Sequence, residues 1–118
     1  MQYRTFGSTG LKLSALGFGG MRFPTDADGQ VDFDQSAALM QRAFDLGVNV
    51  VDSHPGYCGG KSEPAIGHAI RGRREGLILS TKFPTSGDCS ASTLRAKLSR
   101  FRAPRTNCSP TPGAYALP

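Results

Sequence analysis

The stretch VNVVDSHPGYCGGKSE, residues 48–63, decides the fold, because an apolar run stops there on an acid. Its β-branched start, residues 48–53, is typical of a parallel strand that is buried on both faces. The run reaches Asp52, and Tyr57 follows five residues later in a loop of glycine and proline. A buried strand has little structural use for a carboxylate at its tip. The pattern therefore predicts that both side chains project into one cleft.

Three other segments have the composition of strands. Residues 2–14 predict a β-hairpin around the turn GSTG, and ALGFG, residues 15–19, predicts a short apolar strand. GLILSTKF, residues 76–83, predicts a further buried strand.

Helical patterns lie between these strands. Apolar residues at spacings of three and four predict an amphipathic helix over residues 34–46, which Asp32 or Asp34 caps and the following glycine ends. Ser62 is expected to cap a second helix, and residues 91–101 begin a third. Strands that alternate with helices predict an α/β fold with a parallel sheet.

Two architectures have this alternation, a doubly wound sheet and a (β/α)8 barrel. A dinucleotide-binding turn should open a helix directly, whereas a long loop follows LGFGGM and its glycine spacing differs. We therefore favour the barrel, in which functional residues lie at the carboxyl ends of the strands. Asp52, Tyr57, Lys82, Gly19 and Gly20 all fall at that end.

Tyr, Lys and Asp form a chemically sensible trio. A phenol has an ordinary pKa of about 10 and is a weak proton donor at neutral pH. A nearby ammonium favours the phenolate and lowers the pKa of a phenol, and a carboxylate keeps that ammonium charged and oriented. Such a group could protonate a carbonyl oxygen while hydride arrives at the carbon.

Several motifs in the same order resemble the aldo-keto reductases. They are YRTFGSTGLKLSALGFGGMR, AALMQRAFDLGVNVVDS, GYCGGKSEPAIGHAI and LILSTKF, and the resemblance covers residues 2 to about 99. It implies the N-terminal part of a (β/α)8 TIM barrel whose base is closed by a β-hairpin. It also implies reduction of aldehydes or ketones to alcohols, with NADPH as cofactor and a small carbonyl compound as substrate.

The resemblance also assigns roles to single residues. It makes Tyr57 the general acid, Lys82 the residue that makes the phenol more acidic, and Asp52 the support of the lysine. The cofactor-binding residues that it implies are Gly19, Gly20, Met21 and Asp52. The family's catalytic histidine lies well beyond the lysine, whereas His54 and His68 both precede Lys82.

The end of the chain differs from the rest. Residues 101–118 are rich in proline and show no helical or strand period, so disorder is expected there. A shifted reading frame and an authentic tail both explain this composition. We therefore expect a partial reductase domain over 1–100, a non-native tail over 101–118, and a truncated chain without activity. The alternative is a non-enzymatic remnant or a basic-tailed interaction module.

Charge and cysteine content exclude several classes. The net charge is +5, but residues 1–88 hold nine Lys and Arg and all nine Asp and Glu, so the basic excess belongs to residues 89–118. We therefore predict no nucleic-acid partner. No long apolar run or signal peptide is present, so we expect a cytoplasmic protein without a membrane partner.

The three cysteines, Cys58, Cys89 and Cys108, indicate no disulfide framework. His54 with Cys58 lacks the further ligands that a metal site needs.

Overall fold

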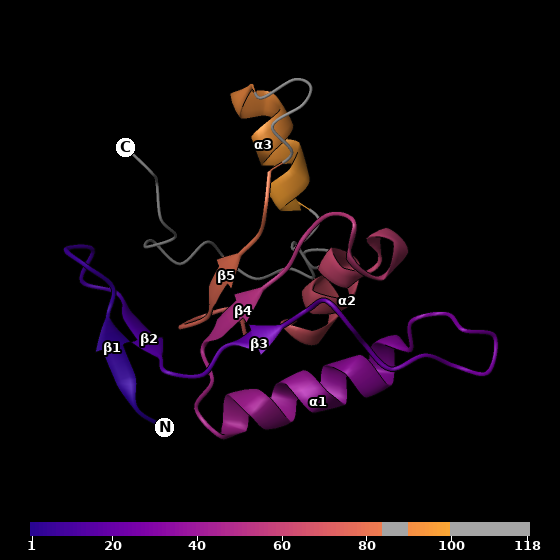
Figure 1. The fold of residues 1–118 in the computed structure, drawn as a ribbon, viewed down its shortest axis with the longest axis horizontal. Coiled ribbons are helices and arrows are strands. Elements are labelled where there is room, and N and C mark those ends of the chain that lie inside the picture. Colours follow the sequence, from indigo (N-terminus) through magenta and orange to yellow (C-terminus); the bar gives the residue numbers. More distant parts are fainter. Residues whose placement is uncertain (84–89, 100–118) are drawn as a thin grey trace.

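The computed structural model describes residues 1–83 and 90–99, and their strands form two sheets (Figure 1). An antiparallel hairpin joins β1 (Tyr3–Thr5) to β2 (Lys12–Ser14). A parallel sheet contains β3 (Phe18–Gly19), β4 (Val50–Asp52) and β5 (Ile78–Ser80) in that order. The predicted hairpin and parallel sheet are thus confirmed. A doubly wound sheet and a barrel share this arrangement of their first strands.

The strands of the parallel sheet are shorter than predicted. The expected strand over 48–53 begins only at Val50, because the amide of Val48 still donates to the carbonyl of Ala43 at the end of the preceding helix. The strand expected over 15–19 keeps its last two residues, and that over 76–83 keeps Ile78–Ser80. β-branched and apolar runs therefore extend beyond the hydrogen-bonded ladder into the connections.

Helices connect the parallel strands. Helix α1 (Phe33–Asp45) lies between β3 and β4, and helix α2 (Ser62–Ala69) lies between β4 and β5. A short 3-10 helix, η1 (Tyr57–Gly60), precedes α2, and α3 (Ala91–Leu98) follows β5. Helices α1 and α2 pack against each other, as the Gln41 amide shows by donating to the Ala69 carbonyl at 2.5 Å.

The ends of α1 follow its sequence signals. The Asp32 carboxylate accepts from the Gln35 amide at 2.9 Å, so Asp32 rather than Asp34 is the N-cap. Gly47 has φ +91°, the left-handed conformation that commonly ends a helix at a glycine. The buried face of α1 packs on β4 and α2, and the core cluster consists of Met40, Phe44, Val51, Ile66, Ala69, Ile70 and Leu77.

The hairpin lies at the amino end of the parallel sheet, as the resemblance implied (Figure 1). The amide of Ser14 donates to the side-chain oxygen of Asn49 at 2.8 Å, and Asn49 is the residue before β4. The Tyr3 hydroxyl donates to the Gly47 carbonyl at 2.8 Å, in the turn that leads to the same strand. Asp52 occupies the opposite end of β4, so the hairpin leaves the carboxyl edge of the sheet uncovered.

The predicted capping role of Ser62 is wrong. Ser62 is the first residue of α2, and the preceding position, Lys61, makes no side-chain capping bond. The Ser62 hydroxyl donates instead to the Gly20 carbonyl at 2.7 Å and lies 2.7 Å from the Ser53 hydroxyl. The side chain is fully buried, so its hydroxyl bonds the ends of the neighbouring strands rather than its own helix.

Gly20 has no room for a side chain, and this gives a first prediction. A Cβ atom there would lie 2.7 Å from the Ser62 hydroxyl oxygen, 3.0 Å from a methyl carbon of Ile66 and 3.1 Å from the Asp52 carbonyl oxygen. We expect Gly20→Ala to lower the free energy of unfolding by about 1–3 kcal/mol through overpacking. Chemical denaturation measures this. Gly19→Ala is the control, because no atom lies within 4 Å of its Cβ position; equal losses for both variants would contradict the prediction.

Some predictions concern residues that the structure does not describe. The third helix is confirmed over Ala91–Leu98, whereas residues 100 and 101 of its predicted range, the tail over 101–118, Cys89 and Cys108 lie outside the described residues. Within the described part of the chain, no helix is long and apolar enough to cross a membrane.

Candidate active site

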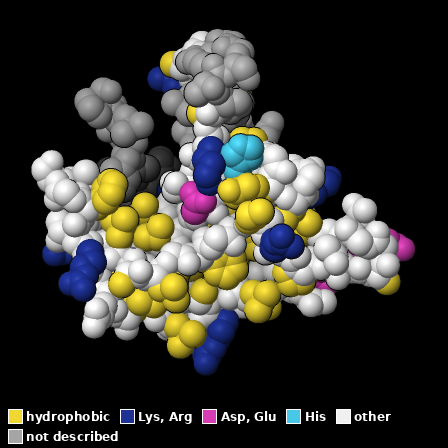
Figure 2. All heavy atoms as spheres, viewed as in Figure 1, with side chains coloured by type: hydrophobic (Ala, Val, Ile, Leu, Met, Phe, Trp, Pro, Cys, Tyr) yellow, Lys and Arg dark blue, Asp and Glu magenta, His cyan; other side chains and the backbone are white. Residues whose placement is uncertain are grey.

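The three polar side chains predicted to share a cleft meet at the carboxyl edge of the parallel sheet. Asp52 ends β4, Lys82 follows β5 by two residues, and Tyr57 opens η1. The Lys82 ammonium lies 2.7 Å from an Asp52 carboxylate oxygen and 5.0 Å from the centroid of the Tyr57 ring. Acidic, basic and histidine side chains gather together on one exposed face (Figure 2). The three side chains therefore lie together at this edge as predicted, while the cleft expected to hold them stays a prediction and their chemical roles are proposed below.

Hydrogen bonds hold both oxygens of the Asp52 carboxylate. One oxygen accepts from the Ser80 hydroxyl at 3.0 Å, and the other accepts from Lys82 at 2.7 Å. Lys82 also donates to the Ser53 carbonyl at 3.1 Å. The ammonium is therefore anchored at the tip of β4, while both charged side chains stay about half exposed.

The electrostatics follow from this pairing. The hydrogen bond from Lys82 lowers the pKa of Asp52 below its ordinary 3.8, against an opposing effect of burial. The hydrogen bond to Asp52 raises the pKa of Lys82 above its ordinary 10.5, and Tyr57 contributes in the same direction. Both groups are therefore charged throughout the neutral range, so Tyr57 has a cation beside it at every physiological pH.

This pairing predicts how stability depends on pH. The contribution of Asp52 is present above pH 3.8 and is lost as pH falls through its lowered pKa. The contribution of Lys82 is present below pH 10.5 and is lost as pH rises through its raised pKa. We expect Lys82→Met to make the unfolding midpoint depend less on pH, both in the acid range and in the alkaline range. It should also raise the pKa of Asp52, as measured by an NMR titration of the carboxyl group.

Lys12→Met is the matched control for that measurement. The Lys12 ammonium bonds the Thr5 hydroxyl at 2.8 Å in the hairpin, which lies at the amino end of the parallel sheet, opposite Asp52. An Asp52 titration that Lys82→Met leaves unchanged would show that the ion pair does not form in solution.

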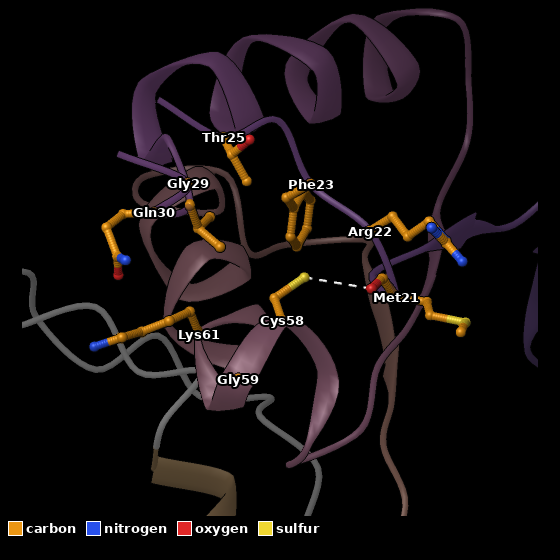
Figure 3. A pocket seen from close by; sticks show the side chains of 10 residues that line it. Met21, Arg22, Phe23, Thr25, Gly29, Gln30, Cys58, Gly59 and Lys61 are labelled. Carbon is orange, nitrogen blue, oxygen red and sulfur yellow. Dashed lines mark hydrogen bonds between the residues drawn. The ribbon is translucent and has the colours of Figure 1, made fainter. Parts of the chain in front are cut away.

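A tight turn presents Tyr57. The Tyr57 amide donates to the His54 carbonyl at 3.0 Å, and the two rings lie 5.1 Å apart. Cys58 follows with φ +53°, a left-handed conformation that is uncommon outside glycine. Its thiol donates to the Met21 carbonyl at 3.3 Å and joins the turn to the loop after β3 (Figure 3). Sequence reasoning missed this contact, because residues so far apart in the chain give no local signal.

A cavity of about 510 Å³ adjoins this turn (Figure 3). Its walls come from the loop after β3 and from Cys58, Gly59 and Lys61, which follow Tyr57 in the chain. Lys61 and Arg22 contribute positive charge, and Phe23 and Val31 contribute apolar surface. The cavity therefore lies next to the turn that carries Tyr57, and its lining is both charged and apolar.

The residues assigned to a cofactor differ in accessibility. Gly19 pairs with Asp52 in the sheet, is exposed, and has open space at its Cβ position. Met21 is 57% exposed. Gly20 is buried, and packing against Ser62 and Ile66 by itself accounts for a glycine there. Gly19 and Met21 are therefore accessible from solvent, whereas Gly20 is not.

Each of the two histidines has a hydrogen-bond partner outside the Asp52–Tyr57–Lys82 trio. The Nδ1 atom of His54 accepts from the Gly56 amide at 2.9 Å, which orients the ring within its own turn. His68 lies near Asp34 at 3.2 Å between α1 and α2, away from the trio. Within residues 1–83 and 90–99, no three His, Cys, Asp or Glu side chains form a potential metal site.

This geometry defines an α/β protein that carries Asp52, Lys82 and Tyr57 together at the carboxyl edge of its parallel sheet. A family model described as the aldo/keto reductase family matches residues 15–103. The chain belongs to this family.

Relatives and solved structures agree with that assignment. L-galactose dehydrogenase of Arabidopsis thaliana is 34% identical over 104 residues, which are 83% of this chain and 32% of that protein. A protein of the same plant named "Probable voltage-gated potassium channel subunit beta" is 36% identical over 86 residues, 70% of this chain and 25% of that protein. An aldo-keto reductase from Klebsiella pneumoniae in complex with NADPH superposes with a TM-score of 0.67 at 27% identity, covering 86% of this chain and 36% of that one.

The extent of these matches bears on the fold. The chain spans a quarter to a third of the length of the curated relatives it matches. Aldo-keto reductase neighbours imply a (β/α)8 barrel, and the described residues supply β3, β4 and β5 as an open parallel sheet that does not close into a barrel.

Proposed function

We propose that this chain carries the proton-donating part of a site that reduces aldehydes or ketones to alcohols, with Tyr57 as general acid. The observation that carries the proposal is the Lys82 ammonium, which bonds Asp52 at 2.7 Å and lies 5.0 Å from the Tyr57 ring centroid. Membership of the aldo/keto reductase family supports an oxidoreductase function.

Each residue of the trio has one task in this proposal. Tyr57 donates its proton to the carbonyl oxygen of the substrate as negative charge develops there. The Lys82 ammonium stabilises the phenolate that remains, because an adjacent opposite charge favours the ionised form. Asp52 holds Lys82 in place through its carboxylate, which Ser80 holds from the other side.

We propose NADPH as the cofactor, since an NADPH complex is among the similar structures. Gly19, Met21 and Asp52 would hold its nicotinamide end along the carboxyl edge of the sheet, and the buried Gly20 would hold the backbone between Gly19 and Met21 in place. When bound, the cofactor supplies the hydride for the substrate carbon. The cavity beside Cys58 is the proposed place for the substrate's remaining groups.

We also propose that the 118-residue chain alone binds no NADPH at micromolar concentration and turns over no carbonyl substrate. The open sheet supports this, because β3 and β5 each pair with a single strand within the described residues. A complete barrel takes about 250 residues. A non-enzymatic role is the alternative for the chain as it stands.

The test compares the chain with a chimera in which residues 1–99 replace the matching part of the Klebsiella pneumoniae reductase. NADPH oxidation is assayed with a generic aldehyde, and NADPH binding is followed by fluorescence titration. We expect turnover by the chimera and neither turnover nor saturable binding by the chain alone. A folded chimera that binds NADPH without turnover would contradict the proposed site, and an active 118-residue chain would contradict the proposed inactivity.

A further inference from the structure

Two consecutive polar residues at the start of α2 are buried. Ser62 is 0% exposed and Glu63 is 1% exposed. Glutamate is almost never fully buried without a partner, because removing a carboxylate from water is costly. Within the described residues, every buried side-chain nitrogen and oxygen has a hydrogen-bond partner. The Ser62 hydroxyl and the Glu63 carboxylate both bond residues outside α2, so this helix start joins other elements together.

Ser62 connects α2 to two strand ends. Its hydroxyl donates to the Gly20 carbonyl after β3 and lies 2.7 Å from the Ser53 hydroxyl after β4. The Ser53 carbonyl in turn accepts from Lys82 at 3.1 Å. Ser62, the first residue of α2, therefore bonds the side chain of Ser53, and the carbonyl of the same serine accepts from Lys82.

Glu63 connects α2 to the third strand end. One of its carboxylate oxygens accepts from the Thr81 hydroxyl at 2.8 Å. Thr81 stands between Ser80 and Lys82, the two residues whose side chains bond the two oxygens of Asp52. Strand β5 ends at Ser80, so Thr81 and Lys82 lie beyond the hydrogen-bonded ladder. The Glu63 bond therefore holds the segment from which the lysine extends.

We propose that Glu63 is a positioning residue that fixes Lys82 through Thr81 and so sets the geometry of the Asp52–Lys82 pair. This inference rests on the proposed function for its catalytic meaning. A glutamate suits the task, because its side chain is long enough to carry an acceptor oxygen from α2 to the Thr81 hydroxyl at 2.8 Å. Glu63 lies in the first turn of α2, where the helix dipole favours negative charge.

The test uses the full 118-residue chain and needs no turnover. Thr81→Val removes the hydroxyl at nearly constant volume, whereas Thr81→Ser keeps it. The readout is the pKa of the Asp52 carboxyl from an NMR titration, which reports how closely Lys82 is held. We expect Thr81→Val to raise this pKa toward the ordinary 3.8, and Thr81→Ser to leave it as in the parent chain. If Thr81→Val does not fold, Glu63→Asp withdraws the acceptor while keeping a carboxyl group and should have the same effect.

Ser36→Ala is the control for general destabilisation. Ser36 is fully buried in α1, and its hydroxyl donates to the Asp32 carbonyl at 2.5 Å, at the start of the same helix. This variant should lower the unfolding midpoint without moving the pKa of Asp52. Folded Thr81→Val protein with the parent pKa would overturn the positioning role. An inactive chimera would instead count against the proposed function, since the titration does not depend on activity.

Discussion

Replacing Tyr57 with phenylalanine in the chimera is expected to lower kcat for aldehyde reduction by about 10²- to 10⁴-fold, the usual contribution of a general acid. The substitution removes the proton donor and keeps the ring that lies 5.1 Å from His54 and 5.0 Å from the Lys82 ammonium. The shape of the turn should therefore persist. The loss should fall on kcat more than on KM, because the proton moves only as the oxygen becomes negative.

Tyr3→Phe is the matched control, since it removes a phenol hydroxyl at the other end of the sheet. The Tyr3 hydroxyl bonds the Gly47 carbonyl at 2.8 Å in the hairpin region. Its loss should lower stability slightly and leave kcat unchanged. Equal rates for Tyr57→Phe and the parent chimera, both saturated with NADPH, would remove Tyr57 from the mechanism and require another proton donor.

Ile66→Ala is expected to lower the free energy of unfolding by about 2–5 kcal/mol, the usual cost of truncating a fully buried aliphatic side chain. Ile66 is 0% exposed and belongs to the core cluster of α1, β4 and α2. It also lies directly beneath Gly20, with a methyl carbon 3.0 Å from the Cβ position of that glycine. The cavity would thus open under the loop that carries Met21. Chemical denaturation of the 118-residue chain measures the loss.

Leu39→Ala removes the same number of methyl groups from an exposed position of α1. Leu39 is 52% exposed, so its truncation should change the free energy of unfolding by about 0.5 kcal/mol or less. The contrast between the two variants is the result that matters. Similar losses for both would mean that α2 does not pack on the sheet as the structure has it.

Local patterns in the sequence account for the elements and for the place of the trio. The apolar spacing of α1, the Asp32 cap and the glycine after the helix act within a few residues of one another, so they can be recognised without the fold. Asp52 and Lys82 were predicted to meet because each follows a buried strand, and parallel strands end at the same edge of a sheet.

Only the tertiary structure decided how that edge is held together. Ser62 has the sequence position of a helix cap, but its hydroxyl bonds Gly20, 42 residues away. Glu63 lies in the first turn of α2, yet it bonds Thr81, 18 residues away. Local propensity carries no information on such partners, because they are selected by burial: once α2 packs over the strand ends, each polar group that loses water needs a new hydrogen bond. The sequence by itself therefore determined which residues stand at the carboxyl edge, and the packing of α2 determined how they are positioned there.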